Sequence, residues 1–207
     1  MFSFIPTGGR IDPALHADPA WHIHTVAHDL VLIDAWRLPV AGADTDFREF
    51  MDMFLSLDLA DNDQSAASNL LFAARSKLGE LFGWDDEVLT QPIPGCVETS
   101  LRDRLPPELR ESAAGVDDSQ SEFRIVYQTE VEAVVELSNS TVHAAVHFAW
   151  VSVEGANHVG QMGIYTKTRG RFGGAYMIAI APFRHHVVYP ALMRRLESAW
   201  DQWLSTR

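Results

Sequence analysis

Histidine is the residue type in this sequence with the most versatile chemistry, because imidazole titrates near neutral pH and binds metals. The chain has nine histidines. His143 and His147 lie in the apolar run 141–153, and on a β-strand their spacing separates them by about 13 Å, too far to share one metal ion. Two closer pairs have weak metal-ligand spacing: His22 with His24, and His185 with His186. No carboxylate or cysteine lies at a supporting spacing, so the sequence predicts no metal site and no cofactor.

Nucleophilic catalysis has little support. The Gly-x-Ser-x-Gly motif of serine hydrolases is absent. Cys96, the single cysteine, follows Pro94-Gly95 with no basic residue beside it. A thiol needs such a neighbour to become a strong nucleophile, so we interpret Cys96 as a buried or edge thiol. The catalytic residues, if there are any, stay unknown at this level.

Aromatic side chains on the predicted strands are better candidates for a ligand site. Most aromatic residues on strands belong to the core, but an apolar cavity would be lined by some of them, with one or two polar tips to orient the bound molecule. Two leucines of the last predicted helix would close such a cavity. The predicted ligand-binding residues are Tyr127, Phe148, Trp150, Tyr165, Tyr176, Leu192 and Leu196.

The strand predicted over 141–153 is apolar on both faces, because side chains alternate along a strand. One face carries Phe148 and Trp150, and the other carries His143 and His147. We expect the aromatic face to turn toward the C-terminal helix, since unpaired imidazoles are costly to bury. The histidine face is then expected to be exposed or to contact another subunit, which suggests a homodimer.

These residues must be positioned by a small set of elements. A strand is expected over 30–40, followed by helices near 46–55 and 70–82. From residue 123 the apolar residues alternate, which predicts strands over 123–128, 131–137, 141–153, 159–168 and 175–181. Short turns join them, so neighbours should be antiparallel. A long amphipathic helix from about 188 ends the chain, with Pro190 in its first turn.

Three segments make up the predicted domain organisation. Residues 1–27 are rich in proline and glycine and are expected to form an extended arm. Residues 28–207 are expected to form a single domain. Within it, 84–121 is a loop-rich insertion that holds one short helix near 105–114, because the elements before it are too few to close a core alone.

The fold class predicted from this order is α+β. A curved antiparallel sheet of about six or seven strands would wrap around the C-terminal helix, with two helices after the first strand. The chain resembles the helix-grip superfamily (START-like, SRPBCC), and within it an uncharacterised bacterial family of domains of unknown function. The resemblance covers residues 28–205 and is carried by the segments 70–79, 136–143 and 176–185. It implies a hydrophobic cavity between sheet and helix, but no reaction.

Charge and composition exclude some partners. The net charge is −12, from 16 basic and 28 acidic residues, and such a field repels nucleic acid and anionic membranes. No apolar stretch approaches the roughly 20 residues of a membrane span. The first residues lack the pattern of a signal peptide, so the expected location is cytoplasmic.

Three functions remain open. The first is binding of a small hydrophobic molecule, such as a lipid, a polyketide or an aromatic compound. The second is an enzyme of the polyketide cyclase or dehydratase type, with a histidine, tyrosine or arginine of the cavity as acid and base. The third is a protein-interaction module whose core is filled by its own side chains.

Overall fold

The computed structural model describes residues 7–17, 21–57, 100–113, 124–138, 142–153 and 157–207. The predicted helix over 70–82, Cys96, the turn after residue 138 and most of the insertion 84–121 lie outside these residues. The fold and its sites are therefore built from the remaining elements.

A six-stranded antiparallel sheet forms the centre of the fold, in the order β1-β2-β6-β5-β4-β3. Its strands are β1 (Gly9–Arg10), β2 (Val31–Gly42), β3 (Arg124–Gln128), β4 (Glu132–Ser138), β5 (Val142–Val153) and β6 (Asn157–Thr168). The antiparallel run of strands from residue 123 to 168 is confirmed. Strand β1 was not predicted, because it is too short for any periodicity to reveal it.

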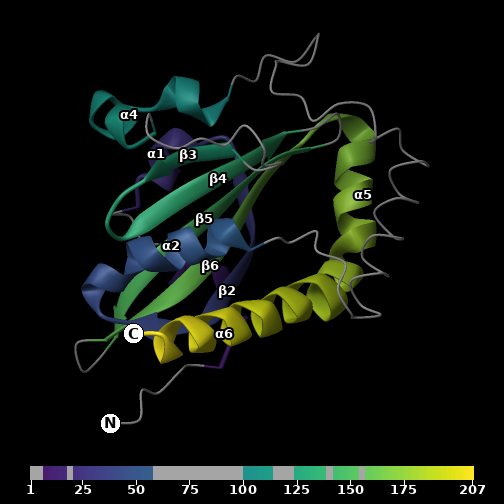
Figure 1. Cartoon of the computed structure of the whole chain (residues 1–207). Helices are drawn as coiled ribbons and strands as arrows, with labels where there is room; N and C mark the ends of the chain where they lie inside the picture. Colours follow the sequence, from purple (N-terminus) through teal and green to yellow (C-terminus); the bar gives the residue numbers. More distant parts are fainter. Residues whose placement is uncertain (1–6, 18–20, 58–99, 114–123, 139–141, 154–156) are drawn as a thin grey trace.

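Two helices cover one face of the sheet, here called the inner face. They are α2 (Phe47–Ser56) and α6 (Tyr189–Ser205), which cross the near side of the sheet in Figure 1. Pro190 lies in the first turn of α6 as predicted.

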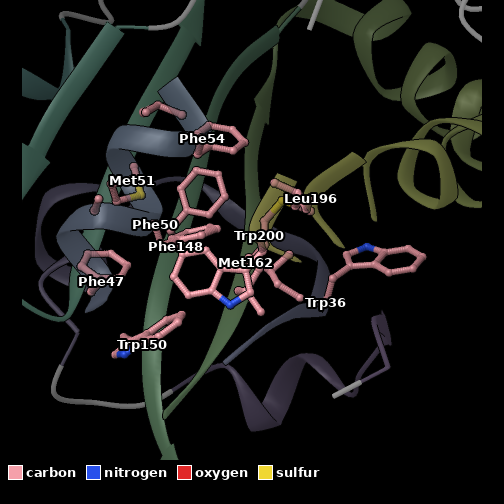
Figure 2. Packing of buried hydrophobic residues seen from close by; sticks show 14 of the residues in the cluster. Trp36, Phe47, Phe50, Met51, Phe54, Phe148, Trp150, Met162, Leu196 and Trp200 are labelled. Atoms are coloured by element: carbon pink, nitrogen blue, oxygen red, sulfur yellow. The ribbon is translucent and has the colours of Figure 1, made fainter. Parts of the chain in front are cut away.

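The inner face is filled by interlocking aromatic rings (Figure 2). Phe50 stacks on Trp150 with ring centroids 5.9 Å apart, and Phe148 lies 4.5 Å from Phe54. Trp200 and Leu196 of α6 are completely buried against this layer. Burying each such side chain contributes about 1.5–3 kcal/mol. The expectation that Phe148 and Trp150 turn toward the C-terminal helix is confirmed.

The opposite face of the sheet, the outer face, is covered by the chain's own segments. These are η1 (Pro13–Leu15), α1 (Ile23–Val26), η3 (Leu101–Arg104) and α4 (Pro107–Ala113). Ile23, Leu101 and Leu105 pack there on Tyr127 and Val134. The apolar character of both faces of β5, from which we inferred a homodimer, is thus accounted for within one chain.

The strand predicted over 175–181 is wrong. Residues Gly170–Phe183 form the helix α5, which stands at the side of the sheet in Figure 1. Strand β6 already pairs with β2 on one side and β5 on the other, so no edge remains beside it for a hairpin partner. A short run of apolar residues fits a buried strand and an apolar helix equally well. Only the pairing decides between them.

No helix within the described residues is both long and apolar enough to cross a membrane.

Candidate functional site

The first polar cluster lies on the outer face around Glu132, a carboxylate that is 1% exposed. Its Oε2 accepts hydrogen bonds from the Tyr127 hydroxyl at 2.9 Å and from His147 Nε2 at 3.0 Å. Its Oε1 accepts from the backbone N–H of His22 at 3.0 Å and from the His22 ring. Burial alone would raise the pKa of Glu132, but these donors outweigh it and hold the pKa at about 2.

A third imidazole extends this cluster. His16 Nε2 lies 2.9 Å from His147 Nδ1, and His16 Nδ1 lies 3.0 Å from Gln161 Oε1. Burial, together with the neighbouring His147, lowers the pKa of His16 to about 4. His16 can approach the sheet this closely because Gly163 lies beneath it: a Cβ at that position would overlap the His16 ring.

A similar arrangement holds His143. Its Nε2 lies 3.1 Å from Oε2 of Glu136, and Glu136 also accepts from the Leu101 backbone N–H at 2.9 Å and from the Ser100 hydroxyl. Burial opposes ionisation of Glu136, yet these hydrogen bonds lower its pKa. Glu136 thereby joins η3 to the sheet, as Glu132 joins the N-terminal segment to it.

The expectation that His143 and His147 are exposed, or lie against another subunit, is therefore wrong. They are 1% and 0% exposed. A buried imidazole is costly only when it has no partner, and each of these has a carboxylate from β4. These carboxylates and His147 already have hydrogen-bond partners within the chain. We therefore interpret the clusters around Glu132 and Glu136 as structural: they hold the covering segments on the outer face.

A different kind of cluster lies on the inner face at Asp34 of β2, which is 1% exposed. Its Oδ1 lies 2.7 Å from His185 Nε2 and 3.3 Å from a terminal nitrogen of Arg10. Its Oδ2 lies 3.4 Å from a terminal nitrogen of Arg184 and accepts from the Tyr189 hydroxyl at 3.4 Å. We call these five residues the Asp34 cluster.

The helix that delivers three of these side chains is irregular at this point. Between α5 and α6 the chain forms the π-helical turn η4 (Arg184–Val188), in which the Tyr189 N–H donates to the carbonyl of Arg184. Pro182 precedes this turn and Pro190 follows it. Proline cannot donate to the carbonyl four residues earlier and clashes with it, which favours such a widening. The π turn brings Arg184 and Tyr189 to the same carboxylate oxygen. Single π turns inside helices frequently occur at functional sites.

Trp36 joins the Asp34 cluster to the aromatic core. Its ring centroid lies 4.8 Å from that of Tyr189 and 6.3 Å from that of His185. Figure 2 shows its indole turned away from Trp200 and Phe148. Burial raises the pKa of Tyr189 above its ordinary value, and Asp34 adds to this effect while Arg184 opposes it. Tyr189 is therefore a protonated hydroxyl at neutral pH.

The residues predicted to line one cavity are distributed over three places. Phe148, Trp150 and Leu196 belong to the packed inner core, and Leu192 lies against it. Tyr127 and Tyr165 lie on the outer face, where burial raises the pKa of Tyr165 to about 12. Tyr176 lies in α5 rather than on a strand.

The Asp34 cluster was not predicted, although the sequence contains one signal of it. Asp34 is the single charged residue in the run Val31-Leu32-Ile33-Asp34-Ala35-Trp36, and a charge in a buried strand requires partners. His185 was considered only as half of a weak metal-ligand pair. Its neighbour His186 is exposed. Among the residues that the structure describes, no group of three or more histidine, cysteine and acidic side chains could hold a metal ion.

Comparison with protein families gives one match. The model of a family described as "Protein of unknown function (DUF2867)" matches residues 26–191. Searches of curated proteins and of solved structures found no match.

Proposed function

The chain belongs to the DUF2867 family, a family of proteins of unknown function, and from the Asp34 cluster we propose that it binds a small hydrophobic molecule. The molecule would lie between the inner face of the sheet and the helices α5 and α6, with its polar end at Asp34. The START-like, helix-grip relationship is part of this proposal. It is supported by the antiparallel sheet and by the C-terminal helix that crosses it.

The observation that carries the proposal is a small set of convergent polar groups at the border of an apolar layer. Ligand sites have this composition: mostly apolar walls, with few polar groups that fix the orientation of the ligand. Helix α5 is suited to form an apolar wall of such a site, because Arg171 is its single charged residue. Its Ile178 is 77% exposed, so α5 also presents an aliphatic side chain at its surface.

The position of the ligand differs from the one expected from sequence. The layer between the sheet, α2 and the C-terminal half of α6 is occupied by the rings of Phe50, Phe148, Trp150 and Trp200. In this layer the protein's own side chains fill the core, which leaves no place there for a ligand. The α5 end of the inner face, where Asp34 and Trp36 lie, is therefore the part we assign to the ligand.

An environment-sensitive dye tests this function. The folded protein should increase the dye's fluorescence, and medium-chain amphiphiles should displace the dye. Trp36→Ala should weaken dye binding. Trp203→Ala should not, because Trp203 stacks on Trp200 in the last turns of α6 and packs against the filled part of the core. Native mass spectrometry of the purified protein would detect a retained ligand. If a folded sample binds no dye and carries no ligand, the interaction-module hypothesis is preferred.

A second candidate function, acid–base catalysis of the cyclase or dehydratase type, is favoured by the pair of His185 and Asp34. A carboxylate 2.7 Å from Nε2 orients the ring and leaves Nδ1 as the nitrogen that could take a proton from a ligand. The protonated Tyr189 hydroxyl would be the acid. His185→Gln should then abolish turnover of a bound polyketide-like substrate while its affinity changes little. Equal turnover in the variant would remove this candidate.

A further inference from the structure

The Asp34 cluster carries more positive than negative charge. Arg10 and Arg184 both approach the one carboxylate, at 3.3 and 3.4 Å, and among the described residues no other acidic side chain forms an ion pair with either arginine. The charged groups that act on the pKa of the adjacent Tyr189 are the same three. This local excess contrasts with the net charge of −12 of the whole chain.

Two hydrogen-bond donors beside the cluster lack acceptors. Arg184 Nε and Trp36 Nε1 are buried and have no hydrogen-bond partner within the described part of the chain. Trp36 is only 7% exposed, so water does not freely replace a partner. The remaining contact of the Arg184 guanidinium is weak, because its Nη1 lies 3.9 Å from the thioether sulfur of Met177.

The nature of these atoms limits what can satisfy them. An indole N–H and a guanidinium N–H donate and never accept, so the missing partner must be an acceptor. Buried donors without partners are rare in native structures and call for an explanation. The four contacts on Asp34 already occupy its two oxygens, so Asp34 cannot supply the acceptor.

We propose that the ligand's polar end is a carboxylate, which would accept from Arg184 Nε and Trp36 Nε1; the protein would thus bind hydrophobic monocarboxylic acids. This inference rests on the proposed function. One negative charge on the ligand balances the excess of one positive charge that the two arginines leave over Asp34. A polyanion such as a phosphate monoester would exceed that balance and would be repelled by the acidic chain as a whole.

The test compares ligands that share a chain and differ in the head group. Dodecanoic acid, dodecanol and dodecylamine are titrated as competitors of the dye at pH 8, below their aggregation concentrations. We expect the acid to bind at least about tenfold more tightly than the alcohol, since charge-assisted hydrogen bonds are about twice as strong as neutral ones. The amine should bind most weakly of the three.

Two variants locate the preference. Arg184→Gln and Trp36→Phe should each reduce affinity for the acid about tenfold and leave affinity for the alcohol within about twofold. Trp36→Phe keeps an aromatic ring in place, so it remains informative if Arg184→Gln does not fold. Arg37→Gln is the matched control. Arg37 neighbours Trp36 on β2 and is exposed. The control therefore removes one arginine charge, as Arg184→Gln does, and should leave the affinity for the acid unchanged.

The possible outcomes separate the two proposals. If acid and alcohol displace the dye equally well, the proposal of a carboxylate ligand is overturned, and the proposal of hydrophobic binding stands. If the acid is preferred but neither variant changes the preference, the assignment to Arg184 and Trp36 is overturned. If the folded protein binds neither the dye nor any competitor, both proposals fail.

Discussion

His16 of the N-terminal segment and His147 of β5 form an imidazole–imidazole contact of 2.9 Å across a sequence separation of 131 residues. Such a contact needs one N–H donor and one nitrogen lone pair, so it accommodates a single proton between the two facing nitrogens. A second proton would place two N–H groups against each other. The contact is therefore disrupted when acid adds a second proton to the pair.

Acid should destabilise the protein through His16. Its pKa is about 4 in the folded protein and 6.5 in the unfolded chain, so the unfolded chain binds the proton first. The stabilisation is complete above pH 6.5 and is lost as pH falls toward 4, by up to about 3 kcal/mol. The groups that face His16 are His147, His24, Glu132 and Gln161. Urea denaturation between pH 8 and 4.5 measures the effect.

A variant separates His16 from other titrating groups. His16→Gln should reduce the slope of unfolding free energy against pH between 6.5 and 4.5. His28→Gln, at an exposed histidine, should leave the slope as it is. Equal slopes in all three proteins would show that His16 is not the group responsible.

Gly163 should be intolerant of a side chain. A Cβ at this position would overlap the His16 ring and lie 3.1 Å from Cε2 of Tyr165. Gly163→Ala should therefore lower the unfolding free energy by about 1–3 kcal/mol. In Gly174→Ala the new methyl group meets nothing within 4 Å, and since Gly174 lies inside α5, that variant should gain up to about 1 kcal/mol. A neutral Gly163→Ala would contradict the packing of His16 on the sheet.

Removing the charge of Asp34 should cost about 3 kcal/mol or more, because it leaves the largely buried Arg184 without its carboxylate. Asp34→Asn keeps the shape and tests the charge alone. Asp52→Asn provides the control, since Asp52 is exposed on α2. The readout is the midpoint of chemical denaturation for each variant and the parent. Coinciding midpoints for Asp34→Asn and Asp52→Asn would mean that the cluster is not held together by Asp34.

Helix α6 should depend on Leu196, which is 0% exposed in the inner core. Leu196→Ala should lower the unfolding free energy by about 2–5 kcal/mol, through lost burial and the cavity left behind. Glu197→Ala, one residue along on the exposed side of the helix, should change it by less than about 0.5 kcal/mol. Thermal or urea unfolding followed by circular dichroism gives both values. If Leu196→Ala leaves the unfolding free energy unchanged, α6 does not pack on the sheet through Leu196.

The sequence alone predicted the elements whose residues follow a regular period. Strand β5 was predicted over 141–153 and is Val142–Val153, and α6 was predicted from about 188 and begins at Tyr189. The side of β5 that faces the C-terminal helix was also predictable, because a continuous apolar face with Phe148 and Trp150 belongs in the core. These features depend on neighbours in the sequence, which is why local patterns contain them.

What only the tertiary structure decided depends on residues far apart in the chain. The apolar run in α5 fits a strand as well as a helix, and β6 already has a neighbouring strand on each side. His147 is buried because Glu132 and His16 reach it from other segments. Asp34 becomes part of a charged cluster only when η4 brings Arg184 and His185 to it. The cost of burying a charge or an imidazole depends on its partners in space, and one-dimensional spacing does not contain that information.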